Sequence, residues 1–175
     1  PELANVTIES HKGDIRAINS TYLDELAHLQ FFNSDWAKWD ETFDFVAGKN
    51  TSYLQRNINS DSFISSNVDV VAIYNAKQEN ILTVKKDGEA FAVIKDLSEL
   101  TTDINLENVL NQDEICAMIR MHERIGYFCS NNIQDSEERQ TPNGTLIFIR
   151  VIDENIIKRL QNLTHSKISL NVYSD

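Results

Sequence analysis

The sequence predicts an α+β fold in which a long N-terminal helix packs beside a mostly antiparallel sheet of about five strands flanked by helices. Apolar residues recur at helical spacing over the first third of the chain, and segments rich in Val and Ile follow. Short polar turns join most of these segments, as hairpins require. We expect one domain over residues 1–175, with a long helix in 1–30, shorter helices in 31–66 and the sheet region in 67–175.

Composition excludes several classes of protein. The chain has 175 residues, of which 41% are hydrophobic, and its 16 basic and 27 acidic side chains give a net charge of −11. Nucleic acid binding depends on neutralising phosphates, so this balance opposes it. No apolar run approaches the roughly 20 residues that span a bilayer. The chain begins at Pro1 rather than Met, and we expect it to be part of a longer protein.

The first predicted helix covers Asn5–Gln30. Ile8, Ile15, Tyr22 and Leu29 recur every seven residues along it, which is typical of an amphipathic helix with one apolar stripe. We expect this stripe to be exposed near the N-terminus and to support a weak homodimer. The net charge favours a mostly monomeric domain in dilute solution.

A second helix is predicted over Ser34–Ala47, with Trp36, Trp39 and Phe43 on one arc and Asp40 at its edge. A third covers Thr51–Ile58, with Asn50 as its N-cap. A longer helix is predicted over Asn105–Glu123, and Asp153 is a good N-cap for a last one over Glu154–Leu163.

The predicted strands are rich in β-branched residues or alternate in polarity. Thr145–Ile152 is apolar on both faces and should therefore lie in the centre of its sheet. The other strands are expected at Val68–Tyr74, Ile81–Lys86, Phe91–Ile94, Ile125–Cys129 and Lys167–Tyr173.

Cysteine and histidine usage suggests neither a metal centre nor a catalytic set. Cys116 and Cys129 lack CxxC spacing, and we expect two separate buried thiols, with a disulfide as the alternative. The four histidines are scattered, and neither a metalloprotease, a P-loop nor a nucleophile-elbow motif occurs. We expect no cofactor and no enzymatic activity of the domain itself.

The segment Asp35-Trp36-Ala37-Lys38-Trp39-Asp40-Glu41-Thr42-Phe43-Asp44-Phe45-Val46 resembles the signature of the fourth class of CHASE extracellular sensor domains. The hairpin VDVVAIYNAKQENILTV and the closing segments GTLIFIRVID and KRLQNLTHSKISL are similar to the same family. Lys77 and Gln78 stand where the family often has an Asp-Gly turn, and Ile149 stands where it often has Gly.

The resemblance implies a Cache/PAS-like sensor placed outside the cytoplasmic membrane, between two transmembrane helices. It further implies a cytoplasmic output of the histidine kinase, diguanylate cyclase, phosphodiesterase or chemotaxis type. We therefore expect an extracytoplasmic ligand-sensing domain of a signal-transduction receptor. The alternative is a structural or protein-interaction module with no small-molecule ligand, in which side chains fill the pocket.

Two tryptophans beside a carboxylate could wall a pocket for a small molecule, although both could equally be core anchors. Arg150 lies in an apolar strand row and requires an acceptor, for which Asp40 and Asp153 are candidates. We expect Asp40, the one that the family signature carries, to pair with Arg150; a ligand carboxylate would also serve. The residues expected to bind a ligand are Trp36, Trp39, Asp40, Tyr74, Tyr127 and Arg150.

Overall fold

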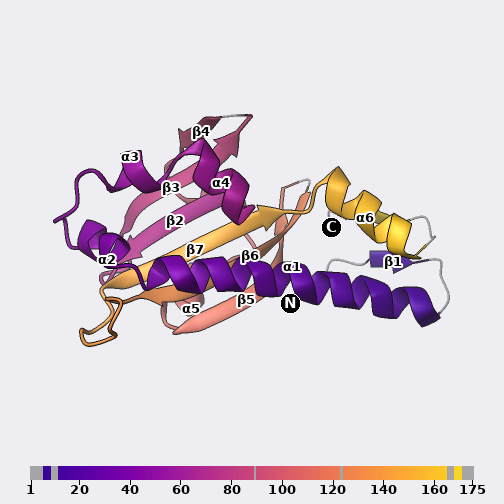
Figure 1. Ribbon diagram of the computed structural model, residues 1–175, viewed down its shortest axis with the longest axis horizontal. Coiled ribbons are helices and arrows are strands. Elements are labelled where there is room, and N and C mark those ends of the chain that lie inside the picture. Colours follow the sequence, from indigo (N-terminus) through magenta and orange to yellow (C-terminus); the bar gives the residue numbers. More distant parts are fainter. Residues whose placement is uncertain (1–5, 9–11, 89, 123, 165–167, 171–175) are drawn as a thin grey trace.

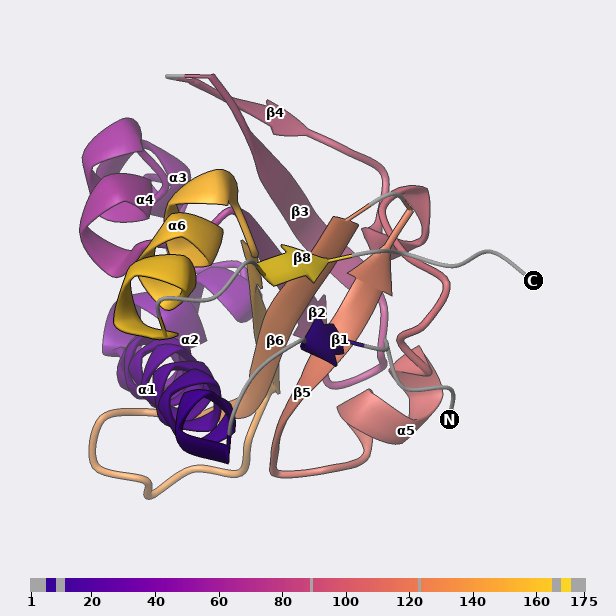
Figure 2. The same ribbon diagram turned by 90° about the vertical axis from the view of Figure 1, so that its right-hand side faces the viewer.

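The computed structural model describes residues 6–8, 12–88, 90–122, 124–164 and 168–170. Their core is a six-stranded antiparallel sheet with helices on both faces, which confirms the predicted α+β class (Figure 1). Figure 2 shows α1, α2, α3, α4 and α6 on one side of the sheet and α5 on the other. The first group is α1 (Lys12–Ala37), α2 (Asp40–Val46), α3 (Tyr53–Asn57), α4 (Ser60–Ser66) and α6 (Glu154–Thr164); the second is η1 (Leu97–Glu99) and α5 (Leu106–Leu110).

The strand order in this sheet is β4-β3-β2-β7-β6-β5. As predicted, β7 is central: Phe148 pairs with Val71 on one side and with Cys129 on the other. Phe148 faces α1, while Ile147 and Ile149 face the opposite layer, so both faces of β7 are buried. The strands are β2 (Val70–Asn75), β3 (Asn80–Asp87), β4 (Ala90–Val93), β5 (Glu114–Met121), β6 (Arg124–Ile133) and β7 (Gly144–Val151).

The helix expected over Asn105–Glu123 is wrong beyond residue 110. Only α5 is helical, and residues 114–121 form the edge strand β5, which pairs with β6 along its whole length. Ile115, Met118 and Ile119 have helical spacing because this edge strand is partly covered on both faces, so its apolar residues do not alternate.

The expectation of two separate thiols is also wrong. Cys116 and Cys129 are directly opposed in the β5–β6 pair, with Cα atoms 4.1 Å apart, and they form a disulfide. The antiparallel register brings them together. The predicted helix over Asn105–Glu123 contained Cys116, so this cross-strand pairing could not be predicted.

The first helix begins later than expected and runs further. Residues 6–8 form the strand β1, which pairs with β8 (Ile168–Leu170) in a separate two-stranded sheet. The single helix predicted for 5–30 is therefore wrong at its start, where three consecutive residues, Val6-Thr7-Ile8, favour a strand. The expected last strand is confirmed at residues 168–170 but lies outside the main sheet; its remaining residues, and Ile15's side chain, are outside the described part.

The helix expected over Ser34–Ala47 is interrupted. Trp39 has an extended backbone and serves as the N-cap residue of α2, so α1 ends at Ala37 and α2 begins at Asp40. Asn50 does not cap α3, which begins after Ser52, and α4 was not predicted. The predicted cap of α6 is confirmed, because the Ile156 amide donates to Asp153 Oδ1 at 2.9 Å.

The structure shows the backbone at two positions, Gln78 in a turn and Ile149 in β7, where the sequence departs from the family pattern. Gln78 has a φ of 63°, the left-handed conformation that favours glycine, although it is not glycine here. Ile149 lies in unbroken register with Val70 and Phe128, so no bulge occurs at that point.

Gly144, at the start of β7, is expected to tolerate no side chain. A Cβ there would lie 2.2 Å from the Tyr74 carbonyl oxygen, whereas a Cβ at Gly88, in an exposed turn with a φ of 64°, would meet nothing within 4 Å. Gly144→Ala should lower the free energy of unfolding by more than about 3 kcal/mol, and Gly88→Ala by about 1 kcal/mol. Urea denaturation measures both, and equal losses would contradict the crowding at β7.

Candidate functional site

The structure does not bring the six residues expected to bind a ligand into one pocket. Trp36, Tyr127 and Arg150 lie on the sheet face that α1 covers, because Tyr127 and Arg150 are direct cross-strand partners in the row of Phe148. Tyr74 lies on the opposite face, with Ile147 and Ile149. Its hydroxyl is buried, and desolvation raises the pKa of Tyr74 against the opposing effect of the neighbouring Asn80 and Leu97. A single pocket therefore cannot contain all six.

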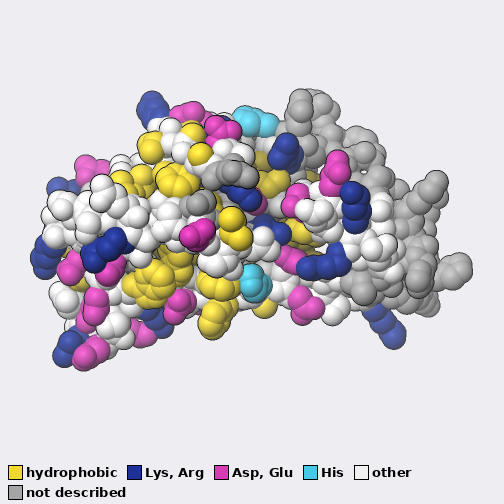
Figure 3. Space-filling view, turned by 45° about the horizontal axis from the view of Figure 1, so that its top comes forward, with side chains coloured by type: hydrophobic (Ala, Val, Ile, Leu, Met, Phe, Trp, Pro, Cys, Tyr) yellow, Lys and Arg dark blue, Asp and Glu magenta, His cyan; other side chains and the backbone are white. Residues whose placement is uncertain are grey.

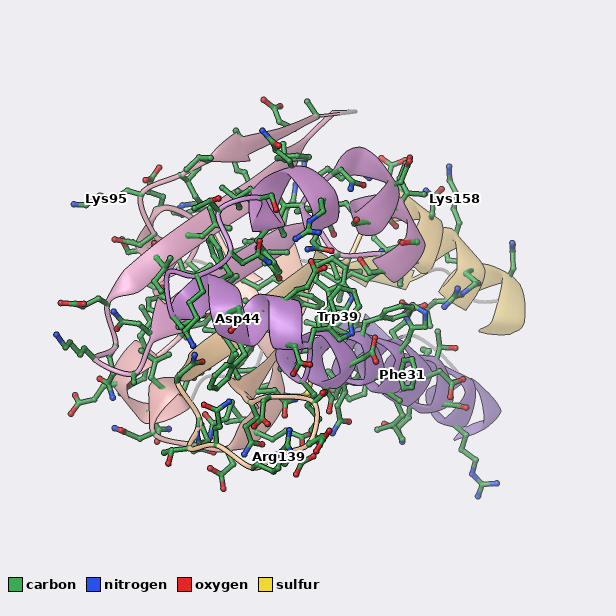
Figure 4. All side chains as sticks on the ribbon, turned by 60° about the vertical axis from the view of Figure 1, so that its left-hand side comes forward. Phe31, Trp39, Asp44, Lys95, Arg139 and Lys158 are labelled. Atoms are coloured by element: carbon green, nitrogen blue, oxygen red, sulfur yellow. A yellow bond between two sulfur atoms is a disulfide. The ribbon has the colours of Figure 1, made fainter. Side chains whose placement is uncertain are left out.

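The two tryptophans stack on each other across the break between α1 and α2. Their ring centroids are 4.9 Å apart with planes at 26°, and Trp36 meets the ring of Phe148 edge-on at 5.3 Å. Trp36 is buried and Trp39 is half-buried at the junction of the two helices (Figure 4). This geometry favours the core-anchor interpretation for Trp36.

The expected pairing of Asp40 with Arg150 is wrong. Asp40 is exposed, and its carboxylate accepts from the Ser136 amide at 2.9 Å and from the Ser136 hydroxyl at 3.1 Å. These hydrogen bonds lower the pKa of Asp40. Since the Gln134 amide also donates to the Ala37 carbonyl at 3.0 Å, the α1–α2 junction holds the start of the β6–β7 connection.

Arg150 contacts Glu25 and the backbone of Asn67 instead of Asp40. Its Nε lies 3.5 Å from Glu25 Oε2, an ion pair rather than a hydrogen bond, and its Nη1 donates to the Asn67 carbonyl at 2.6 Å. The other oxygen of Glu25 accepts from Arg159 on α6. We call Glu25, Arg150 and Arg159 the Glu25 cluster; it joins α1, β7 and α6.

The Glu25 cluster is largely removed from water. The side chains of Glu25 and Arg150 are 8% and 12% exposed, whereas that of Arg159 is 55% exposed. Tyr22 and Tyr127 pack beside it with ring centroids 5.5 Å apart. Burial, followed by the charge of Glu25, raises the pKa of Tyr127 to about 12. The exclusion of water thus strengthens the ionic contacts. Removal of one partner would leave an unpaired buried charge and lower the free energy of unfolding.

Sequence reasoning found that Arg150 needs a carboxylate but not which one. Glu25 was overlooked because only the apolar residues of the first helix were traced. Its position three residues after Tyr22 and four before Leu29 places it on the same helix face as both, and a charged residue inside an apolar arc was the available signal.

A second polar group anchors the other half of α1. The fully buried Asn33 donates to the Leu146 carbonyl at 3.1 Å and accepts from the Asn131 side chain at 3.2 Å. Because Asn33 bridges β7 and β6, it fixes the position of α1 along the sheet.

Neither metal nor membrane-spanning features occur in the described part of the chain. No three His, Cys, Asp or Glu side chains gather there as a group that could hold a metal ion. No described helix is both long and apolar enough to cross a bilayer.

Part of a known histidine kinase is similar to this chain in sequence. A region of the "Methanogenesis regulatory histidine kinase FilI" of Methanothrix harundinacea (strain 6Ac) is 30% identical over 138 residues, which is 75% of this chain and 16% of that protein. The chain thus spans about one sixth of the length of this relative.

Solved structures share the fold at low sequence identity. The extracellular domain of vpHK1S-Z8 is 10% identical with a TM-score of 0.62, over 85% of this chain and 58% of that one. The periplasmic domain of LuxQ from Vibrio cholerae is 13% identical with a TM-score of 0.57, over 89% and 71%. The pattern of the CHASE4 domain family matches residues 22–171, which include the tryptophan motif and the whole Glu25 cluster. The chain belongs to the CHASE4 domain family.

Proposed function

We propose that this CHASE4 domain is the extracytoplasmic sensor of a transmembrane receptor with a histidine-kinase-type output, and that the domain itself is not catalytic. Family membership and the similarity to part of FilI support this. The Cys116–Cys129 disulfide also supports it, because disulfides persist in oxidising compartments outside the cytoplasm. The pairing of β1 with β8 suits a domain attached to one membrane surface at both ends.

The observation that carries the proposal is the Glu25 cluster. In such a receptor, α1 and α6 are the described helices nearest the two ends of the chain, and each contributes a side chain to the ionic contacts of the buried Glu25 carboxylate. A movement of β7 must either carry Glu25 with it or separate two buried charges, and a movement of α6 must carry Glu25 or break its contact with the half-exposed Arg159. The cluster therefore provides a discrete link by which a change at the sheet biases two arrangements of α1.

Of the six residues expected to bind a ligand, Tyr127 and Arg150 fit this transmission role. Both touch or flank Glu25 from the centre of the sheet. Trp36, Trp39 and Asp40 instead hold the α1–α2 junction and the β6–β7 connection in place.

The location is tested by labelling intact cells that produce the parent protein with a membrane-impermeant amine reagent. Lys158 is 67% exposed, and Figure 4 shows Lys95 and Lys158 pointing away from the body of the domain. Tryptic peptides containing these lysines should be labelled while those of a cytoplasmic marker are not. Labelling that requires lysis would contradict the proposal.

Loss of Glu25 should be severe. Glu25→Gln leaves Arg150 buried without its counter-charge and should lower the free energy of unfolding by about 3–5 kcal/mol in urea at pH 7. The control Glu154→Gln removes a carboxylate that is 89% exposed and 3.9 Å from Lys158, and should cost less than about 0.5 kcal/mol.

Pairing Glu25→Gln with Arg150→Met distinguishes a real interaction from general damage. The double variant should recover part of the summed loss, because the orphaned charge is then gone. Strictly additive losses would contradict the ion pair, even where Glu25→Gln alone proves too unstable to purify.

We further propose weak self-association through α1, but not through the stripe expected from sequence. Tyr22 and Leu29 pack against the core, so their face is not available. Leu23 and Phe31, eight residues apart, are 52% and 66% exposed on the outer side, and Ala27 lies between them. Figure 3 shows hydrophobic side chains gathered over this half of α1, and Figure 4 shows Phe31 on its outer surface. Two copies related by a two-fold axis would present this same patch to each other.

Phe31→Asp should abolish concentration-dependent self-association of the domain in sedimentation equilibrium. Val93→Asp, which places the same charge on β4 at a residue that is 72% exposed, should leave it unchanged. A tight dimer in dilute solution, or equal behaviour of the two variants, would be inconsistent with this interface.

A further inference from the structure

A cleft of about 650 Å³ lies where β3, β2 and β7 meet the β5–β6 turn. Figure 2 looks onto this end of the sheet, with the β3–β4 hairpin on one side and the β5–β6 hairpin on the other. Its volume falls within the range of about 300–1,000 Å³ that small-molecule sites occupy. The cleft shares no residue with the Glu25 cluster.

Charged side chains divide the cleft into regions of opposite sign. Lys85 and Lys86 come from β3 on one side, and Arg124 comes from the start of β6 on the other. Asp69 and Asp153 come from the start of β2 and the end of β7, which lie between those strands. Val70, Leu100, Met121 and Val151 supply apolar lining.

The three cations are available to a ligand as far as the described residues show. Neither Lys85, Lys86 nor Arg124 forms an ion pair within 4.0 Å of a described carboxylate. Lys86 and Arg124 are exposed, and Lys85 is half-buried beside its register partner Val70. An anionic group between the two sides would meet positive charge from both.

The two carboxylates each have one oxygen already engaged. Asp69 Oδ2 accepts from the Val151 amide at 2.7 Å, and Asp153 Oδ1 accepts from the Ile156 amide at 2.9 Å. No described residue donates to the second oxygen of either. Desolvation raises the pKa of Asp69, while the Val151 hydrogen bond and the charges of Arg150 and Lys86 act in the opposite direction. An ammonium group beside the second carboxylate oxygen would add to this compensation.

We propose that this cleft binds a small zwitterion of the α-amino acid class. Its ammonium group contacts Asp69 and Asp153, and its carboxylate lies between the β3 lysines and Arg124. A simple anion would meet the two aspartates unfavourably, and a simple cation would meet three basic side chains. Only a ligand with both charges matches both regions.

The position of the cleft connects it to the proposed sensor function, on which this inference rests. Asp153 caps α6, the helix that holds Arg159 against Glu25. Asp69 binds the amide of Val151, the residue after Arg150. A ligand held by these two aspartates therefore acts on both residues that contact Glu25.

The experiment measures the thermal stability and heat of binding of the domain with twenty L-amino acids, each at 10 mM. Every amino acid is accompanied by its N-acetyl derivative, which lacks the ammonium charge, and its methyl ester, which lacks the carboxylate. At least one amino acid should raise the Tm and bind measurably, and both of its blocked derivatives should not. Binding of a blocked derivative as tightly as its parent would overturn the zwitterion assignment, and so would no binding by any of the twenty.

Variants then locate the site. Arg124→Gln and the double variant Lys85→Gln/Lys86→Gln should each raise the Kd of the amino acid at least tenfold. The control Lys95→Gln changes an exposed lysine outside the cleft and should leave the Kd unchanged. Unaltered binding in both cleft variants would place the ligand elsewhere and overturn the proposal. Because the surface-labelling experiment needs no ligand, failure here is distinguishable from failure of the sensor function.

Discussion

The structure depends on one buried carboxylate. Glu25 projects from α1 toward the sheet, where the side chains of Arg150 and Arg159 contact its two oxygens. Moving a carboxylate and a guanidinium out of water costs several kcal/mol each, so the arrangement is stable only while the partners stay in place. For that reason the positions of α1, β7 and α6 are coupled. Apolar contacts alone would allow small sliding movements, whereas this contact tolerates few arrangements.

The remainder of α1 is fixed by different chemistry. Asn33 bridges two strands through its amide, and Trp36 rests edge-on against Phe148 while stacking on Trp39. One end of the helix is thus held by close packing and hydrogen bonds, and the segment around Glu25 by charge in addition to the apolar contacts of Tyr22 and Leu29. Ionic contacts are the more easily altered by a nearby charged group, because their energy depends on local charge and solvent access. A signal that enters near α6 would then act first on the Glu25 segment.

Local sequence patterns predicted the elements whose burial is complete or whose ends are capped. The apolar residues on both faces of β7 located the sheet centre, and Asp153 located the start of α6. Prediction failed where pairing between distant segments decides the structure. Residues 114–121 have helical apolar spacing, but pairing with β6 makes them a strand, and the Cys116–Cys129 bond depends on that same register. The strand β1 requires β8, which lies some 160 residues away along the chain.

The site was predictable only in part, for the same reason. An arginine in an apolar strand row must have an acceptor, and Arg150 does pair with a carboxylate, as the sequence predicted. The identity of the acceptor depended on how α1 crosses the sheet, which no local pattern contains. Tyr74 and Tyr127 were both predicted in strands, yet the register places them on opposite faces of the sheet. Whether the six residues share one pocket could therefore not be predicted without the fold.

Amide hydrogen exchange of the domain carrying Glu25→Gln tests the coupling most directly, because it reports the local stability of each element. If the Glu25 cluster joins the elements, exchange should accelerate in α6 and in residues 16–30 of α1 by a larger factor than in β2 and the Trp36 end of α1, where it should change only as the global stability does. Extra acceleration confined to α1, with α6 changing by the same factor as β2, would show that α6 is held by its apolar contacts and would contradict the proposed link.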